Sequence, residues 1–438
     1  MIFREGDGVS CHLILVKKDT DWFVEDRFGM FIHWGLYSLP AHHEWVKSRE
    51  QICTADYQKY FERFDPDLYD PAVWAREARN AGMKYMVITS KYHKGFCLWD
   101  SRFTDYKASN TPCSRNLLRD AVDAFRNEGL KIGFYYSLID WHHPEFTVDR
   151  IHPHRDIPSE REANAGRDMK KYAEYMRNQV RELLTDFGKI DIIWFDFSYP
   201  GEDGKSHLDW ESEKLVSMIR QLQPGIIINN RLDLPDGGDI YTPEQYLPPE
   251  WPKDEQGQKL VWEGCQTFSG AWGYHRDEAS WKSVKMCIEM LVNHVSLGGN
   301  LLLNVGPTAR GCFDQRALER LRGIGDWMRF HSRSVYQCTQ APAEFTAPQD
   351  CRYTWNPETR RLYLHLFSWP FKAVHLPGLA DKVEYAQLLN DDSKIKFRSR
   401  KNSVHAALNA QTPDGALTLE LPVIPPVNTI PVIELFLK

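Results

Sequence analysis

Long apolar runs, paired cysteines and an excess of basic charge are all missing from this chain of 438 residues. No window reaches about 18 consecutive apolar residues, so a membrane-spanning helix is not expected. The nine cysteines are scattered and form no CxxC pair, which argues against a zinc module and a dense disulfide framework. Lys and Arg number 54 against 60 Asp and Glu, so the net charge of -6 favours neither a nucleic acid nor an anionic membrane as a partner.

A secretion signal is also missing from the N-terminal sequence MIFREGDGVSCHLILVKKD. Its apolar run is short, is preceded by Glu5 and Asp7, and is followed by no small-residue cleavage site. We therefore expect either a cytoplasmic protein or a mature form from which a signal has been removed.

Aromatic residues are plentiful: they make up 13% of the chain, with 15 Trp, 19 Tyr and 22 Phe. Hydrophobic residues at 42% and charged residues at 26% are typical of a globular protein that buries a large core. Aromatic surface beyond the needs of a core can stack on sugar rings through apolar and C–H contacts. The composition is thus a first hint of a carbohydrate ligand.

Seven short apolar runs alternate with segments of helical period up to about residue 335, a pattern typical of a parallel sheet covered by helices. The predicted strands are 28–34, 85–90, 131–138, 190–197, 225–229, 260–265 and 300–305. The predicted helices are 71–82, 116–129, 168–188, 213–225, 283–299 and 314–331. This pattern predicts an α/β fold in residues 1–335: a TIM-type (β/α)8-like barrel, somewhat irregular, with one weak strand.

The chain from about residue 336 onward has short alternating runs punctuated by Gly, Pro, Asp and Asn. The strands predicted there are 361–369, 372–378, 383–389, 394–399, 416–422 and 431–437. They predict a C-terminal antiparallel β-sandwich domain in residues 336–438.

Polar and aromatic side chains follow the predicted barrel strands, where the active site of a parallel barrel forms. His33 and His93 end or follow the first two strands, and Arg231 follows the fifth. Asp196 ends the fourth run, IIWFD, where burying an unpaired acid would be costly. The other candidates in this position are Glu44, Trp45, Tyr92, Tyr136, Trp194, Glu244 and Glu263.

Two carboxylates on different strands, surrounded by Trp and His, suit glycoside hydrolysis, in which one carboxylate is nucleophile or base and the other is the acid. A retaining enzyme holds them about 5 to 5.5 Å apart and an inverting enzyme about 6.5 to 9.5 Å, a choice that the sequence leaves open. No metal site is predicted, because HExxH spacing is absent and the adjacent His142 and His143 would point opposite ways on an extended segment.

Five motifs in this order, FGMFIHWGLYSLPAHHEW, KYMVITSKYHKGFCLW, GFYYSLIDWHHP, IIWFDF and GGNLLLNVGPTARG, resemble the α-L-fucosidases of glycoside hydrolase family 29. The resemblance covers almost all of the chain to about residue 340. It implies an irregular barrel followed by a β-sandwich, a retaining mechanism, and neither a metal nor another cofactor.

The resemblance also implies roles for single residues. Asp196 matches the nucleophile, and Glu244 in YTPEQY is the expected acid/base, with Glu263 in LVWEGC as the fallback. Tyr136 is preferred to Tyr135 for the tyrosine of the YYS motif. The residues expected to bind the sugar are His33, Glu44, Trp45, Tyr92, His93, Tyr136, Trp194 and Arg231.

One motif departs from the family pattern: where KHHDG is common, this chain has Tyr92 and Lys94 in KYHKG. The expected function is exo-hydrolysis of terminal α-L-fucosyl residues from glycans or glycosides. The departure leaves two alternatives, an exo-glycosidase for a related sugar such as α-L-galactose and a sugar-binding protein without catalysis. The expected partner is a carbohydrate, with no nucleic acid and no membrane, and the oligomeric state stays open.

Overall fold

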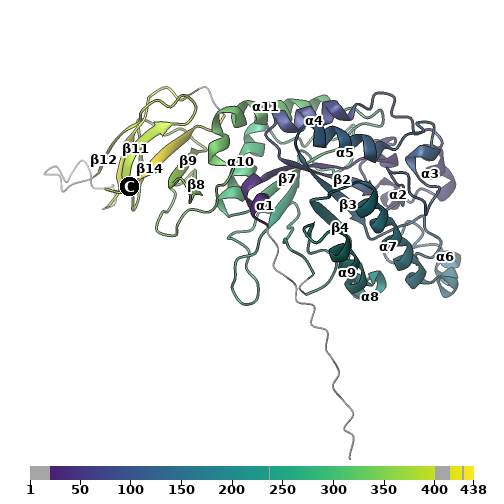
Figure 1. Cartoon of the computed structure of the whole chain (residues 1–438). Helices are drawn as coiled ribbons and strands as arrows, with labels where there is room; N and C mark the ends of the chain where they lie inside the picture. Colours follow the sequence, from purple (N-terminus) through teal and green to yellow (C-terminus); the bar gives the residue numbers. More distant parts are fainter. Residues whose placement is uncertain (1–19, 236, 400–414, 427–428) are drawn as a thin grey trace, which may run out of the picture.

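The computed structural model describes residues 20–235, 237–399, 415–426 and 429–438. A parallel sheet covered by helices forms most of the molecule, and antiparallel strands pack at one end of it (Figure 1). The N-terminal segment on which the expectation of no secretion signal rests lies outside the described residues. Within the described ranges, no helix is long and apolar enough to cross a membrane.

All seven predicted barrel strands are present, and they pair in parallel in the order β5-β4-β3-β2-β1-β7-β6. Their bounds are β1 (Phe28–Ile32), β2 (Tyr85–Lys91), β3 (Lys131–Ser137), β4 (Ile192–Asp196), β5 (Ile227–Ile228), β6 (Glu263–Thr267) and β7 (Asn300–Val305). Nearly every residue in them is buried, which explains the continuous apolar runs in the sequence.

An irregular segment at residues 240–244 spans the gap between the two edge strands β5 and β6. Single parallel bridges join Asn229 to Ile240, Tyr241 to Trp262, and Glu244 to Cys265. The segment takes the place of the weak strand in the predicted barrel, and it brings Glu244 next to the strand ends. The (β/α)8-like, irregular architecture is therefore confirmed.

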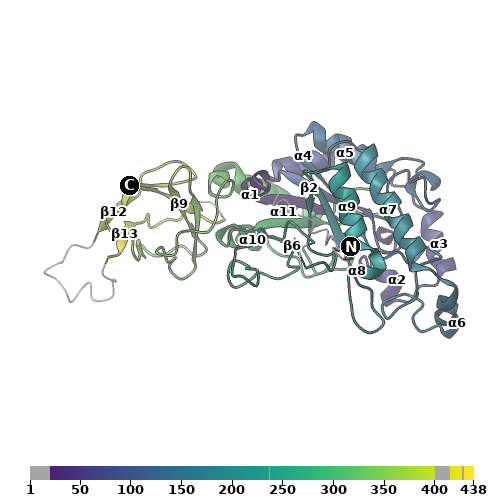
Figure 2. The ribbon, with the colours of Figure 1, turned by 60° about the horizontal axis from the view of Figure 1, so that its bottom comes forward.

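The six predicted helices are present as α4 (Pro71–Asn80), α5 (Leu117–Asn127), α7 (Met169–Asp186), α9 (Ser212–Leu222), α10 (Val284–Ser296) and α11 (Gln315–His331). The side chains of Asp70, Asn116, Asp168, Ser283 and Asp314 cap five of them by accepting backbone N–H bonds. Around the sheet, α4 packs against α5 and α11, α11 against α10, and α7 against α9 (Figure 2).

Shorter helices were not predicted, because segments of four to eight residues show no clear period. They are α1 (Asp21–Asp26), α2 (Val46–Arg49), α3 (Thr54–Phe61), α6 (Pro158–Glu162) and α8 (His207–Trp210). The 3-10 turns are η1 (Leu36–Ser38), η2 (Ala108–Asn110), η3 (Ala163–Gly166) and η4 (Ser332–Ser334). Of these, α2 follows directly on Trp45 and fixes the loop that carries it.

The C-terminal strands form two antiparallel sheets, ordered β11-β14-β9-β8 and β10-β13-β12. Their bounds are β8 (Cys351–Asn356), β9 (Arg361–Leu366), β10 (Ala373–Leu376), β11 (Val383–Leu388), β12 (Lys396–Ser399), β13 (Leu417–Glu420) and β14 (Val432–Leu437). All six predicted strands are present, whereas β8 was missed although its residues CRYTWN alternate between apolar and polar types.

The antiparallel sheets are joined to the barrel through its last helix. The indole N–H of Trp327 on α11 donates to the carbonyl of Ile430 at 2.8 Å, and the hydroxyl of Thr354 on β8 donates to the carbonyl of Ser334 at 2.7 Å. Tyr363 of β9 belongs to the same hydrophobic core as the barrel. The sheets thus contact α10 and α11, and a few of their residues join the barrel core, while most of their buried residues form a second core between the two sheets.

Candidate active site

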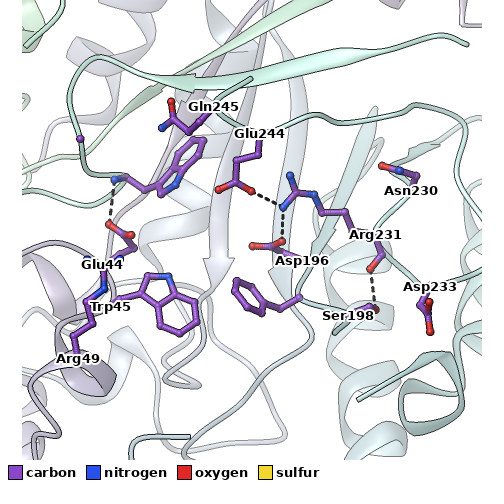
Figure 3. Close-up of a pocket in the computed structure, with 13 residues that line it drawn as sticks. Glu44, Trp45, Arg49, Asp196, Ser198, Asn230, Arg231, Asp233, Glu244 and Gln245 are labelled. Carbon is purple, nitrogen blue, oxygen red and sulfur yellow. Dashed lines mark hydrogen bonds and ion pairs between the residues drawn. The ribbon is translucent and has the colours of Figure 1, made fainter. Parts of the chain in front are cut away.

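A cavity of about 660 Å³ opens where the barrel strands end (Figure 3). Its lining residues are Glu44, Trp45, Arg49, Asp196, Phe197, Ser198, Asn230, Arg231, Asp233, Glu244, Gln245, Gly270 and Trp272. A smaller inner pocket of about 30 Å³ is lined by Phe31, His33, Trp45, Tyr92, Tyr135, Trp194, Asp196, Phe197, Glu244, Cys265 and Trp272. Asp196 and Glu244 line both the cavity and the inner pocket, so these two spaces form one site with an aromatic interior and a polar mouth.

The side chain of Arg231 lies between the two carboxylates (Figure 3). Its Nη1 donates to Asp196 Oδ1 at 2.8 Å and to Glu244 Oε2 at 2.7 Å. Because both oxygens bond to the same nitrogen, they lie no more than about 5.5 Å apart, which is compatible with the spacing of a retaining pair and below the range of an inverting pair.

Asp196 is the last residue of β4 and is 9% exposed. Besides Arg231, the hydroxyl of Tyr135 donates to its Oδ2 at 2.9 Å. Burial raises the pKa of Asp196, while the charge of Arg231 opposes that shift. The carboxylate is thus held in one orientation at the floor of the cavity, beside a permanent positive charge.

Glu244 and Glu263, the two acid/base candidates, lie in different environments. The side chain of Glu244 is 41% exposed and faces the cavity. Glu263 begins β6, is fully buried, accepts hydrogen bonds from Tyr85 (2.5 Å) and Trp194 (3.3 Å), and lines neither space. Burial raises the pKa of Glu263 to about 7. The geometry favours Glu244 over the fallback Glu263, because the carboxyl of Glu263 is enclosed by the barrel core.

His33 lines the inner pocket, and its hydrogen-bond partners determine which ring nitrogen carries the proton. Its Nδ1 lies 2.7 Å from Asn304 Oδ1, and the amide of Asn304 donates to the carbonyl of Trp272 at 2.7 Å. Since the amide nitrogen is used there, the oxygen accepts from His33 Nδ1. Burial lowers the pKa of His33 to about 3, so the ring is neutral and its Nε2 is an acceptor.

His93 has the same arrangement with Ser137. The hydroxyl of Ser137 donates to the carbonyl of Ile139 at 3.0 Å and so accepts from His93 Nδ1 at 2.7 Å. Burial lowers the pKa of His93, which leaves Nε2 as an acceptor, buried and without a protein partner among the described residues. The ring packs on Trp45 at 4.8 Å and on Phe197 at 4.8 Å, directly behind the lining of the cavity.

Glu44 and Trp45 come from the loop before α2, and both line the outer cavity. Glu44 Oε2 accepts the backbone N–H groups of Trp272 (3.1 Å) and Gly273 (2.9 Å). No hydrogen bond to its Oε1 comes from the part of the chain that the structure describes. Glu44 and the two histidines therefore offer acceptors, which suits a ligand whose groups are mainly hydroxyl donors.

The tyrosine that lines the inner pocket is Tyr135 and not Tyr136, which was the one expected at the sugar site. Successive side chains on a strand point to opposite faces, so only one of the two tyrosines can face the barrel interior. Tyr135 lines the inner pocket and binds Asp196, whereas the hydroxyl of Tyr136 donates to Gln179 on α7 at 2.7 Å.

Tyr92 and Trp194 both line the inner pocket. The ring of Tyr92 stacks on His93 at 3.9 Å and on Tyr135 at 5.7 Å. Trp194 lies under Arg231, whose guanidinium is 4.5 Å from its ring. Both side chains are therefore placed as apolar walls.

The structure adds Phe197 and Trp272, which were not predicted. Phe197 follows the end of β4 and has a φ of 78°, a backbone conformation that is rare for bulky residues and is not predicted by sequence propensities. This conformation places its ring 5.0 Å from that of Trp45. Trp272 comes from a loop without a recognisable motif, and its ring lies 5.1 Å from that of His33. Across the described residues, no group of three or more His, Cys, Asp or Glu side chains could hold a metal ion.

A family model described as Alpha-L-fucosidase matches residues 14–333. The chain belongs to the α-L-fucosidase family. The family is also represented by plasma alpha-L-fucosidase from Homo sapiens, 28% identical over 383 residues, which cover 80% of this chain and 76% of that protein.

Solved structures of the family share the fold. Alpha-L-fucosidase isoenzyme 1 from Paenibacillus thiaminolyticus is 44% identical with a TM-score of 0.89, covering 96% of this chain and 98% of that one. A family 29 fucosidase from Bacteroides thetaiotaomicron is 28% identical with a TM-score of 0.81, covering 96% and 94%. Another structure from that organism, with 28% identity, a TM-score of 0.80 and 95% of both chains covered, holds a trapped covalent intermediate. A covalent intermediate of this kind is the mark of a retaining fucosidase.

Proposed function

We propose that this protein is a retaining exo-α-L-fucosidase that releases terminal α-L-fucosyl residues from glycans or glycosides. The observation that carries the proposal is the pair Asp196 and Glu244, bound to one arginine nitrogen at a separation suited to retention. Membership of the α-L-fucosidase family supports the identity of the sugar.

In the first step, a carboxylate oxygen of Asp196 attacks the anomeric carbon, and the bond from that carbon to the leaving oxygen breaks. Glu244, in its protonated form, gives its proton to the leaving oxygen, so the alcohol departs uncharged. The products are a glycosyl ester on Asp196 and an ionised Glu244. Arg231 and the hydroxyl of Tyr135 orient the attacking carboxylate.

In the second step, Glu244 takes a proton from a water molecule whose oxygen attacks the same carbon. The ester bond breaks, Asp196 is released as the carboxylate, and the sugar leaves with its original anomeric configuration. The exposure of Glu244 to the cavity supports this role, because both the leaving alcohol and the incoming water reach the centre from that side.

The sugar is held by acceptors and rings. His33 Nε2 and the carboxylate of Glu44 accept hydrogen bonds from sugar hydroxyls and Arg231 donates one, while His93, which lies behind the lining, supports the ring of Trp45. The apolar faces of the sugar lie against Trp45, Tyr92, Trp194 and Trp272.

Replacing the nucleophile tests the reaction directly. Asp196→Ala should lower the release of nitrophenol from an aryl α-L-fucoside by more than about a thousandfold while the circular dichroism spectrum stays that of the wild type. Asp191→Ala, which alters a buried carboxylate at the other end of β4, is the matched control for loss of stability alone. Near-normal turnover by Asp196→Ala would contradict the assignment.

Replacing the acid/base tests the second role. Glu244→Ala should slow substrates with poor leaving groups far more than aryl fucosides, and added azide, which needs no general base, should restore turnover. Glu263→Ala should show neither effect. Azide rescue of Glu263→Ala alone would exchange the two roles.

Because Tyr92 and Lys94 depart from the KHHDG pattern of the family, the sugar specificity should be tested with a second sugar. The aryl α-L-galactoside, which adds one hydroxyl at C6, should be hydrolysed more slowly than the α-L-fucoside. A faster rate on the galactoside would change the assigned sugar, and tight fucose binding without hydrolysis would indicate a binding protein.

A further inference from the structure

Lys94 is buried beside the site without lining it. It follows His93 in the KYHKG motif and is 2% exposed. Its Nζ donates to the backbone carbonyl of Glu44. The rings of Tyr92, Tyr37 and Trp141 lie 4.5, 5.1 and 5.6 Å from Nζ, so the amine sits in an aromatic cage with one hydrogen bond leading out of it.

The partner of Lys94 is bound on two sides. The backbone carbonyl of Glu44 accepts a hydrogen bond from Lys94, while its carboxylate accepts hydrogen bonds from the backbone N–H groups of Trp272 and Gly273. Glu44 thus ties together three segments that are far apart in the sequence. Each segment supplies one ring to the wall of the site: Tyr92, Trp45 and Trp272.

Burial of an amine is costly, and packing alone would be met by an apolar side chain of the same length. Burial lowers the pKa of Lys94, while the nearby charge of Glu44 opposes the shift. Both the ammonium and the neutral amine carry N–H donors, so the bond to Glu44 is kept in either state. The side chain is therefore suited to holding a backbone in place.

We propose that Lys94 is a positioning residue that fixes the Glu44–Trp45 loop against the segment of Trp272, and thereby sets the spacing of the aromatic walls around the sugar. It touches neither the sugar nor the reacting atoms. The inference rests on the proposed function, because it concerns the binding of the same fucosyl group.

Lys94→Met keeps the length of the side chain and removes the donor. We expect KM for an aryl α-L-fucoside, and the inhibition constant of a fucose-like iminosugar, to rise about tenfold, while kcat changes less than about threefold. Lys205→Met is the matched control, because Lys205 is also buried, donates to the backbone carbonyl of Thr147 at 3.2 Å, lies 4.6 Å from the ring of Phe146, and lines neither the cavity nor the inner pocket. It should leave KM and the inhibition constant within about twofold of the wild type.

Lys94→Arg should recover most of the binding, since a guanidinium also donates and stacks on rings. Equal KM values for Lys94→Met and the wild type, an equal rise in KM in Lys94→Met and Lys205→Met, or a fall confined to kcat would each overturn the proposal. If Lys94→Met does not fold, Lys94→Leu, which also lacks the donor, takes its place with the same expectation.

Hydrogen exchange separates this inference from the proposed function. The amides of residues 44–46 and 271–274 should exchange about tenfold faster in Lys94→Met than in Lys205→Met, whatever the substrate is. Unchanged exchange would refute the role of Lys94 even in an active fucosidase. If exchange is faster in Lys94→Met but the wild-type protein neither binds nor hydrolyses fucosides, the positioning role of Lys94 is supported and the proposed fucosidase function is refuted.

Discussion

One guanidinium serves two carboxylates with different tasks. Arg231 Nη1 binds Asp196 and Glu244 together, and its charge opposes the rise in the pKa of Asp196 that burial causes. A nucleophile has to be ionised before it attacks. Arg231 therefore sets the pH range in which Asp196 can act as well as its position.

Arg231→Met should move the acidic limb of the kcat/KM profile to higher pH and lower kcat/KM about a hundredfold at its optimum. The limb moves upward because the charge that lowers the pKa of Asp196 is lost while its burial stays. Rates measured with an aryl fucoside between about pH 4 and 8 give the profile. Arg220→Met, which breaks a similar partly buried pair with Asp239, should leave the limb in place, and a limb unmoved in Arg231→Met would contradict the argument.

The two adjacent tyrosines of β3 should respond differently to loss of a hydroxyl. Tyr135→Phe removes a hydrogen bond to Asp196 and should lower kcat/KM roughly tenfold or more. Tyr136→Phe removes the bond to Gln179, so it should cost about 1 kcal/mol of stability and leave kcat/KM within about twofold. Aryl-fucoside kinetics and urea unfolding of both variants measure these effects; the reverse pattern would restore Tyr136 to the site.

At the scale of the element, the segment 240–244 decides where Glu244 stands. The side-chain oxygen of Asn230 accepts the backbone N–H of Thr242 at 3.1 Å and its hydroxyl at 2.9 Å. Arg231 reaches the hydroxyl of Thr242 at 3.3 Å and its carbonyl at 3.1 Å. The irregular segment thus fixes both Glu244 and the arginine that binds it.

Thr242→Val should therefore impair catalysis although Thr242 lines neither space. Valine has the same shape but lacks the hydroxyl that joins Asn230 to Arg231, so we expect about 1 kcal/mol less stability and roughly a tenfold lower kcat/KM. Thr354→Val, which loses a buried hydroxyl far from the cavity, should lose similar stability and keep its activity. Equal kinetics for the two variants would show that the segment does not position Arg231.

Elements that are wholly buried or strongly periodic could be predicted from the sequence, and their ends led to Asp196 and His33. Which of Tyr135 and Tyr136 points into the barrel could not be predicted, because a shift of one residue along a strand exchanges its two faces. The segment around Glu244 has only isolated bridges and no apolar run, so its closeness to Asp196 was not visible. Trp272 meets Glu44 across 228 positions, a contact that no local pattern encodes.

At the scale of the whole molecule, several histidines are buried in both parts of the structure. Burial lowers the pKa of His33 and His365 to about 3 and that of His294 and His331 to about 4. His331 lies on α11 and His365 on β9, and both rings contact Trp327 where the sandwich meets the barrel. The join between the two parts therefore depends on neutral imidazoles.

These shifts predict that stability falls as the pH falls below about 6.5. In the unfolded chain the histidines gain a proton near pH 6.5, whereas in the folded state they stay neutral until about pH 3 or 4, so acid favours unfolding. Each such histidine lowers the free energy of unfolding by about 1.1 kcal/mol per pH unit on average between pH 6.5 and 5, where most carboxylates are still ionised. The slope of the unfolding free energy against pH, measured in urea, should decrease in His365→Gln by nearly one proton. A slope equal to that of the wild type would mean that His365 is protonated within the fold, and the join between barrel and sandwich would then tolerate its charge.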